Sequence, residues 1–232
     1  RGICIAHAPD GKTILVAGAA PGDVATIKVV RKRKKHLEAV IERMEIPSPH
    51  RVEPTCMYAA HCGGCSWQHV AYEEQARFKE VEVNENLRRI GGVHVEESRP
   101  IVPAPQALRY RNKLEFSFSA SRWLTWDEIA SNEPIEKGNA LGFHVPGMWD
   151  KIMDIETCHL QPEPSNAIKN FIRSYAKEHG LTFFHPREKH GLLRTLMLRC
   201  TLAGEWMMVL QLFEAPGEEG LALLTAVKAQ FP

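Results

Sequence analysis

The strongest constraint on this chain is a loop of three closely spaced cysteines, Cys56, Cys62 and Cys65, in the pattern Cys-x5-Cys-x2-Cys. Gly63 and Gly64 lack a Cβ atom, so the backbone between the last two cysteines can turn sharply and direct both sulfur atoms toward one centre. Cysteines spaced in this way bind zinc or iron–sulfur clusters. Such a site takes four ligands, so the loop predicts a metal site whose fourth ligand comes from elsewhere in the chain.

The other three cysteines indicate which residue completes the site. The chain has six cysteines, an even number that would suit disulfides in a secreted protein. They are clustered, however, and no signal peptide is visible, which favours reduced, metal-binding thiols. Cys4 and Cys200 lie in apolar runs, where structural thiols are common. Cys158 is therefore the predicted fourth ligand.

The composition of the 232 residues, 44% hydrophobic and 25% charged, is that of a soluble globular protein. No apolar run is long enough to cross a membrane, and no signal peptide is visible. We expect a cytoplasmic protein without membrane contact, and a monomer. The net charge of +1 does not by itself indicate a nucleic-acid partner. The stretch from Lys28 to His36 is nevertheless strongly basic and contains no acid, which predicts contacts with phosphate groups.

Residues 1–46 are predicted to form a small β-barrel of the oligonucleotide-binding (OB) type. Turn-forming sequences separate four short apolar stretches without helical periodicity: 2–7, 13–17, 24–30 and 37–44. The Pro-rich stretch 47–50 is predicted to be a linker to the second domain.

Residues 51–232 are predicted to form an α+β domain with an antiparallel sheet. Apolar residues at three- and four-residue spacing predict a helix over 70–90, and Gly91-Gly92 ends it. Phe116 and Phe118 alternate with polar residues, so they are expected in the core of a half-buried strand. Ser165 is the expected cap of a second long helix. The remaining expected elements are strands at 141–144, 151–155, 192–202 and 206–213, helices at 165–179 and 218–230, and a polar hairpin insertion at 121–140.

Four motifs, in this order, resemble those of the iron–sulfur RNA uracil-5-methyltransferases, the 23S rRNA (uracil-5-)-methyltransferases with a leading TRAM domain. They are Cys56-x5-Cys62-Gly-Gly-Cys65-x2-Gln68-His69, Tyr110-Arg111-Asn112-Lys113, Leu141-Gly142-Phe143-His144 and Asp154-Ile155-x2-Cys158. The resemblance implies a TRAM barrel over 1–46, with its first strand before Arg1, and a central domain over 51–232. It implies that a [4Fe-4S] cluster is held by Cys56, Cys62, Cys65 and Cys158. It also implies that the helix over 70–92 packs on a Rossmann-like methyltransferase domain.

The catalytic motifs of that family are not recognisable in this chain. The family's catalytic cysteine is followed by Asn-Pro, and neither Cys4 nor Cys200 has that context. We therefore expect the Rossmann-like domain, the catalytic residues and the S-adenosylmethionine site to be absent from this chain, which alone would be inactive. The full-length protein would use S-adenosylmethionine to make 5-methyluridine from a flipped-out uridine. Ribosomal RNA is the first candidate substrate and tRNA the second.

Basic residues in both domains are predicted to contact RNA. They are Arg31, Lys32, Arg33, Lys34, Lys35, Arg109, Arg111, Lys113, His144 and Arg194. Arg109, Arg111 and Lys113 alternate, so they are expected to share one face of a strand. A solvated hairpin tip and ordinary salt bridges explain the same residues, and these alternatives stay open.

Two other functions fit the cysteine pattern. Zinc takes the same ligands, so the chain could be a zinc-binding, RNA-binding module without catalysis. Zinc sites with four cysteines are usually two close pairs, whereas here three ligands are clustered and one is distant, which favours the iron–sulfur cluster. A redox sensor whose RNA affinity follows the oxidation of the cluster is the third possibility. Four thiolates leave no iron open to S-adenosylmethionine, so a structural or RNA-positioning role is expected for the cluster.

Overall fold

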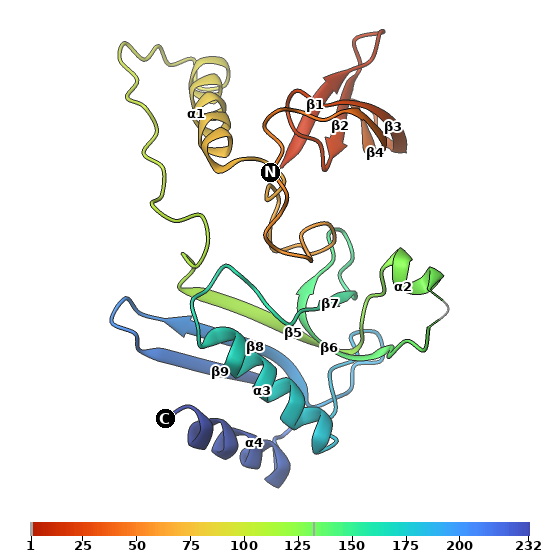
Figure 1. Cartoon of the computed structure of the whole chain (residues 1–232), viewed down its shortest axis with the longest axis vertical. Helices are drawn as coiled ribbons and strands as arrows, with labels where there is room; N and C mark the ends of the chain where they lie inside the picture. The colour runs from red at the N-terminus through yellow and green to blue at the C-terminus, as the bar shows by residue number, and fades with distance from the viewer. Residues whose placement is uncertain (1, 132) are drawn as a thin grey trace. The chain divides into compact units, whose positions relative to one another are not determined.

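The computed structural model describes residues 2–131 and 133–232 (Figure 1). The predictions over 1–46 and 121–140 therefore each include one residue, Arg1 and Asn132, outside the described residues. The chain divides into two compact units. The first comprises Arg1–Ala60 and Cys65–Ala107, and the second comprises His61–Gly64 and Leu108–Pro232. Within the described residues, no helix is both long and apolar enough to cross a membrane.

A four-stranded open sheet forms the centre of the first unit. Its strands are β1 (Ile3–His7), β2 (Thr13–Ala17), β3 (Val24–Lys32) and β4 (His36–Ile46). The spatial order is β1-β2-β4-β3. The pairs β1–β2 and β3–β4 are antiparallel, whereas β2 and β4 are parallel. The predicted strand positions are confirmed, but their arrangement differs from the prediction.

The predicted fold class, which begins with an OB-like TRAM barrel and includes no methyltransferase fold, is wrong. In the described residues, β1 and β3 are the two edges of a mixed sheet rather than neighbours in a barrel. The chain leaves β2, places β3 at the far edge, and returns through a hairpin that brings β4 parallel to β2. Alternating patterns locate strands and hairpins, but they do not specify which distant strands become neighbours.

The first sheet encloses a small core. Ile14, Val16 and Ala39 are buried, and partly buried side chains from the neighbouring strands pack against them. Cys4 belongs to this group, and its Sγ donates a hydrogen bond to the carbonyl oxygen of Ala19 at 3.2 Å. Burial raises the pKa of the Cys4 thiol, which agrees with the structural role predicted for it.

The stretch predicted to be a linker is fixed to this sheet by Asp23, whose side chain is only 4% exposed. Arg51 binds the two carboxylate oxygens with Nε and Nη2, at 2.8 and 2.7 Å. The amides of Ala20 and Ser48 donate to the same carboxylate at 2.6 and 2.9 Å. Burial alone would raise the pKa of Asp23, but these hydrogen bonds outweigh it and lower the pKa to about 2. The Asp23–Arg51 pair is therefore a polar joint that fixes the stretch 47–51 to the first sheet.

The helix α1 (Tyr72–Arg89) follows the cysteine loop and confirms the helix predicted over 70–90. Ala76 is its buried residue, whereas Val83 and the capping residue Ile90 are 57% and 83% exposed. Both of these apolar side chains are therefore exposed. The Tyr72 hydroxyl accepts a hydrogen bond from the amide of Ala104 at 2.8 Å, which ties the returning segment to the helix.

An antiparallel five-stranded sheet forms the second unit, in the order β7-β6-β5-β8-β9. Helices α3 and α4 cover one of its faces (Figure 1). The elements in chain order are β5 (Lys113–Ser121), α2 (Trp126–Ala130), β6 (Gly138–His144), β7 (Ile152–Asp154), α3 (Ser165–Glu178), β8 (Leu193–Cys200), β9 (Trp206–Leu212) and α4 (Gly217–Gln230).

Alternation along the strands separates the two faces of this sheet. Phe116 and Phe118 are 0% and 3% exposed, which confirms their predicted place in the core. Leu196 and Leu198 of β8 are fully buried beside them. Lys113 and Glu115 alternate with the buried residues of β5 and are exposed on the opposite, open face of the sheet.

Two local predictions differ from the structure. The stretch predicted as a polar hairpin contains α2, which a capping box between Thr125 and Glu128 begins. Ser165 does not cap α3, because its hydroxyl is buried and has no hydrogen-bond partner in the described residues. The Glu163 carboxylate instead accepts the amide hydrogens of Asn166 and Ala167, at 3.1 and 3.3 Å. A carboxylate just before the helix thus replaces the predicted hydroxyl cap.

Candidate nucleic-acid interface and cysteine ligands

Two of the four predicted ligand cysteines, Cys56 and Cys65, lie in the first unit, and both are hydrogen-bonded to the side chain of Gln68. The amide of Cys56 donates to Gln68 Oε1 at 3.2 Å, and Gln68 Nε2 donates to the Sγ of Cys65 at 3.1 Å. Burial raises the pKa of the Cys56 thiol; a hydrogen bond from the Tyr58 amide partly opposes this, and the nearby Cys65 raises the pKa further. A cation that replaces the proton would remove this penalty on the thiolate.

The other two cysteines, Cys62 and Cys158, are buried in the second unit. The amide of Gly63 donates to the carbonyl oxygen of His144 at 3.0 Å, which docks the short Cys62–Gly64 segment on the end of β6. A Cβ atom at Gly63 would lie 2.5 Å from that oxygen, so the close approach requires glycine. The amide of Gly64 donates to the Cys62 Sγ at 3.3 Å.

The four predicted ligands are therefore divided between the two units. Cys56 and Cys65 lie in the first unit, and Cys62 and Cys158 lie in the second. Cys62 and Cys158 are buried, and Cys56 and Cys65 are partly buried. Hydrogen bonds from N–H groups reach the sulfur atoms of Cys62 and Cys65, and bonds of this kind stabilise thiolates and adjust the potentials of clusters. The assignment of all four to one cluster remains a prediction.

The basic run lies at the tip of the β3–β4 hairpin and is exposed. Arg31 and Arg33 lie 3.8 and 2.8 Å from the carboxylate of Glu38. The hydrogen bond from Arg33 lowers the pKa of Glu38. In the described part of the chain the lysines of the run make no ion pair: Lys32, Lys34 and Lys35. The salt-bridge alternative therefore applies to the arginines, and the lysines keep their charges available.

Arg109 and Arg111 do not share a strand face with Lys113. β5 begins only at Lys113, and Arg109 has a φ of +56°, which interrupts an extended conformation. The amides of Arg109 and Arg111 instead donate to the carbonyl oxygens of His159 and Leu160, both at 2.8 Å. The backbone of Arg109 and Arg111 thus pairs with the loop after Cys158 and lies outside the sheet, so the predicted strand face is wrong for these two residues.

Lys113 and His144 lie on neighbouring strands of the second sheet, whereas Arg194 has different surroundings. The His144 Nε2 lies 3.4 Å from the Ser117 hydroxyl. Arg194 sits at a bulge in β8, with its guanidinium 5.3 Å from the centre of the Phe184 ring. Within the second unit, Arg194 is therefore held by aromatic rings, whereas His144 is held by a hydroxyl group of the neighbouring strand.

Sequence reasoning missed Arg199, which lies directly opposite Lys113 on the open face of the sheet. Both side chains are exposed, and Glu115 lies 3.8 Å from Lys113. Like charges directly opposite each other destabilise a sheet, so such a pair suits an anionic partner. The alternation in β8 could have identified Arg199 once the pairing of β8 with β5 was known.

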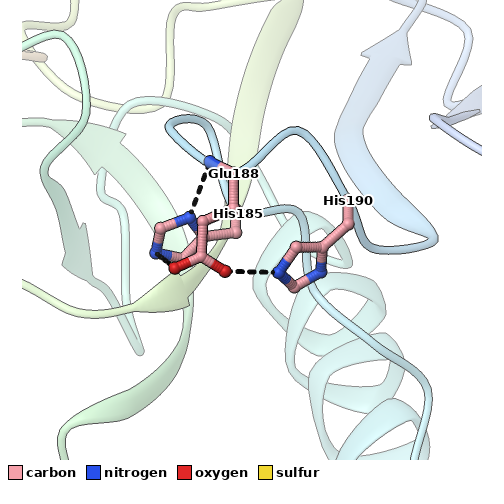
Figure 2. A group of neighbouring side chains, drawn as sticks. All are labelled: His185, Glu188 and His190. Carbon is pink, nitrogen blue, oxygen red and sulfur yellow. Dashed lines mark hydrogen bonds and ion pairs between the residues drawn. The ribbon is translucent and has the colours of Figure 1, made fainter.

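A third group, His185, Glu188 and His190, has donor atoms suited to zinc (Figure 2). The amide of Glu188 points at His185 Nδ1 at 3.1 Å, which leaves the ring proton on Nε2, facing the carboxylate. The other carboxylate oxygen lies 2.8 Å from His190 Nε2. A metal on His185 Nε2 would move the proton to Nδ1, against the amide hydrogen. The group therefore fits a hydrogen-bonded loop better than a metal site.

Comparison with known proteins shows which class of protein this chain resembles. No protein-family model matches the chain. Over 228 residues it is 44% identical to an uncharacterized RNA methyltransferase of Porphyromonas gingivalis, covering 96% of this chain and 49% of the relative. An uncharacterized RNA methyltransferase of Chlorobaculum tepidum is 42% identical, covering 89% of this chain and 43% of the relative. The chain is similar to RNA methyltransferases. It spans about half the length of the curated relatives it matches.

A solved structure extends the similarity to the fold. The crystal structure of Pyrococcus abyssi tRNA (uracil-54, C5)-methyltransferase in complex with S-adenosyl-L-homocysteine matches with a TM-score of 0.62 and 27% sequence identity. The match covers 96% of this chain and 48% of that chain. It also counts against the predicted fold class, which described a barrel and a separate α+β domain without a methyltransferase fold. The two sheets together match part of a methyltransferase structure.

Proposed function

We propose that this chain is part of an S-adenosylmethionine-dependent RNA uracil-5-methyltransferase that makes 5-methyluridine. The observation that carries the proposal is the structural match, along nearly the whole chain, to a tRNA (uracil-54, C5)-methyltransferase. The curated relatives, named as RNA methyltransferases, support the same reaction class independently. S-adenosylmethionine would supply the methyl group, as the S-adenosyl-L-homocysteine in the related structure suggests.

The substrate that we propose is structured RNA, either ribosomal RNA or tRNA. The family resemblance of the motifs points to 23S rRNA, whereas the structural relative acts on tRNA. The exposed lysines Lys32, Lys34 and Lys35 on the β3–β4 hairpin and the Lys113–Arg199 pair on the open face of the second sheet provide positive charge that would bind the phosphate backbone. Basic side chains of this kind position an RNA and do not read its sequence.

We propose that Cys56, Cys62, Cys65 and Cys158 hold a [4Fe-4S] cluster. The donor set fits this group, because iron–sulfur clusters are held by cysteine sulfur and two of the four sulfur atoms accept N–H hydrogen bonds. Four thiolates would fill the coordination of a cubane cluster, so its contribution would be structural or RNA-positioning. Zinc is the alternative, and with it the chain would be an RNA-binding module without catalysis.

The remaining assignments complete the proposal. We assign the first domain to residues 1–46 and the central domain to 51–232. We assign S-adenosylmethionine binding and methyl transfer to a region of the full-length protein. This region would correspond to the half of the relatives that this chain does not cover. The helix α1, equivalent to the predicted 70–92 helix, would pack on that part. We further propose a cytoplasmic monomer.

Metal analysis of the protein purified without oxygen tests the cluster. We expect about four iron and about four sulfide ions per chain, and a brown colour that fades in air. One zinc ion per chain, with no sulfide, would show that the zinc alternative is correct. RNA affinity that changes on reduction of the cluster would support the redox-sensor function instead.

Methyl transfer tests the reaction itself. The full reading frame that encodes these residues is expected to transfer labelled methyl groups from S-adenosylmethionine to uridine in 23S rRNA or tRNA. Residues 1–232 alone are expected to bind these RNAs without methylating them. Methyl transfer by the 232-residue chain would contradict the assignment of the catalytic residues, and methylation of another base by the full-length protein would contradict the uracil-5 assignment.

A further inference from the structure

Cys158 is a buried residue of the loop between β7 and α3, and one side chain of α3 holds its backbone at two points. The amide of Cys158 donates to Asn166 Oδ1 at 2.8 Å, and Asn166 Nδ2 donates to the carbonyl oxygen of Cys158 at 3.2 Å. Asn166 is buried, so water does not compete strongly for these bonds. Glu163 Oε1 accepts a second hydrogen bond from Asn166 Nδ2 at 2.6 Å, which fixes the orientation of the amide group.

The same helix also holds the residues that lead to Cys158. Lys169 is fully buried, and its ammonium group donates to the carbonyl oxygen of Ile155. Asn170 Nδ2 donates to the carbonyl oxygen of Glu156 at 3.1 Å. Burying a lysine is costly, because it removes a charge from water. The hydrogen bond from Lys169 holds the backbone of the loop in place at Ile155.

The residues that follow Cys158 are held from the other side. The amides of Arg109 and Arg111 donate to the carbonyl oxygens of His159 and Leu160, both at 2.8 Å. The backbone is therefore bonded on both sides of Cys158 as well as at Cys158 itself. Little backbone freedom remains, so the direction of the Cα–Cβ bond of Cys158 is set before any ligand binds. Metal ligands held in this way bind more tightly than mobile ones.

We propose that Asn166 is a positioning residue for Cys158, and that its two hydrogen bonds fix this cysteine as a ligand of the iron–sulfur cluster. This inference rests on the proposed cluster, and it goes beyond it by naming a residue that does not touch the metal. Lys169 supports the same loop from one turn further along α3. Its ammonium group is bonded to the carbonyl oxygen of Ile155, three residues before Cys158 in the same loop.

The test compares Asn166→Ala with Ser165→Ala in the 232-residue chain. Ser165 is an adjacent buried residue of α3 whose hydroxyl has no hydrogen-bond partner in the described residues, so its variant controls for small changes at the start of the helix. Each protein is reconstituted with iron and sulfide under anaerobic conditions. We measure iron and sulfide per chain, the rate of cluster loss to a chelator, and the electron paramagnetic resonance spectrum of the reduced cluster.

We expect Asn166→Ala to lose its cluster ~10- to 100-fold faster than the unaltered chain, in line with losses of other residues that orient metal ligands. Its resonance spectrum should change as well, whereas Ser165→Ala should match the unaltered chain in both measurements. A purely structural role would lower the melting temperature of Asn166→Ala but leave the spectrum and the rate of cluster loss unchanged, which would overturn the proposal.

A second variant keeps the proposal testable if Asn166→Ala does not fold. Lys169→Met retains the length and burial of the side chain but removes the donor to Ile155 and the positive charge. It should speed cluster loss by a smaller factor and lower the reduction potential, because a nearby cation favours the reduced cluster. Unchanged values would overturn the positioning role of this helix. An unaltered chain that takes up no iron and sulfide would instead overturn the proposed cluster itself.

Discussion

The two units stabilise their sheets by different means. The first sheet encloses small side chains such as Val16 and Ala39 and depends on the polar joint between Asp23 and Arg51. The second sheet buries large side chains such as Phe116 and Leu198 under two helices. Buried apolar area is the main source of stability, so the second unit should resist unfolding better than the first. An ion pair can therefore contribute a larger share of the stability in a unit whose apolar core is small.

The largest expected effect comes from the core of the second unit. Phe116→Ala should lower the free energy of unfolding of that unit by about 3 to 5 kcal/mol, because it leaves a cavity under α3. Hydrogen exchange followed by mass spectrometry would measure the loss separately for each unit. Val209→Ala, an exposed position on the same sheet, serves as the control and should cost less than about 0.5 kcal/mol. Similar losses for both variants would contradict the core described for this sheet.

The next effect concerns the polar joint of the first unit. Arg51→Met should cost about 2 kcal/mol, less than the ~3–5 kcal/mol typical of fully buried pairs, because the Arg51 side chain is 23% exposed. Folding lowers the pKa of Asp23 from its ordinary value of 3.8 to about 2. The pair therefore contributes fully above about pH 4 and is lost as the pH falls toward 2.

Acid titration of hydrogen exchange in the first unit would detect that loss. The unaltered chain should lose protection in the first unit as the pH falls from about 4 to 2, and Arg51→Met should show much less of this change. An equal pH dependence in both proteins would assign the acid sensitivity to other carboxylates and would remove the joint from the comparison.

A smaller effect is expected on RNA binding by the first unit. Replacing Lys32, Lys34 and Lys35 with Gln should weaken RNA binding about tenfold in moderate salt and flatten its salt dependence, by roughly 0.7 in slope per lost phosphate contact. Fluorescence anisotropy with a labelled RNA hairpin would measure both. The control replaces three other exposed lysines, Lys79, Lys137 and Lys228, for the same change in net charge. Equal losses would mean that the hairpin tip has no special role.

The smallest effect is expected on the exposed face of α1. Val83→Ser should change the stability of the 232-residue chain by less than about 0.5 kcal/mol, because this side chain is 57% exposed. Urea unfolding would measure the change. A loss above 1 kcal/mol would show that the helix is packed against other residues of the chain, and it would contradict the exposed face described here.

The sequence located most elements but not their neighbours. The strand at Thr13–Ala17 and the helix that begins at Ser165 were predicted to within a few residues, because local periodicity and turn residues determine them. The parallel pairing of β2 with β4 joins segments that no local pattern connects. The same limit explains the barrel that was wrongly predicted.

The surroundings of a side chain were predictable only where the sequence pattern leaves one favourable arrangement. Phe116 and Phe118 were placed correctly, because large rings alternating with polar residues have one favourable face. Ser165 was wrongly made a cap, since Glu163, two residues earlier, offers a stronger acceptor for the same amides. Asn166 was not singled out, because nothing in its local sequence shows that its amide group meets Cys158.

The pairing of Lys113 with Arg199 links the stability of the free sheet to its affinity for a polyanion. Added salt screens the repulsion between these two exposed cations, so it should stabilise the free second unit slightly. The same salt screens their attraction to phosphate and weakens an RNA complex. Ionic strength would therefore act in opposite directions on folding and on binding, and bound RNA should protect β5 and β8 most at low salt.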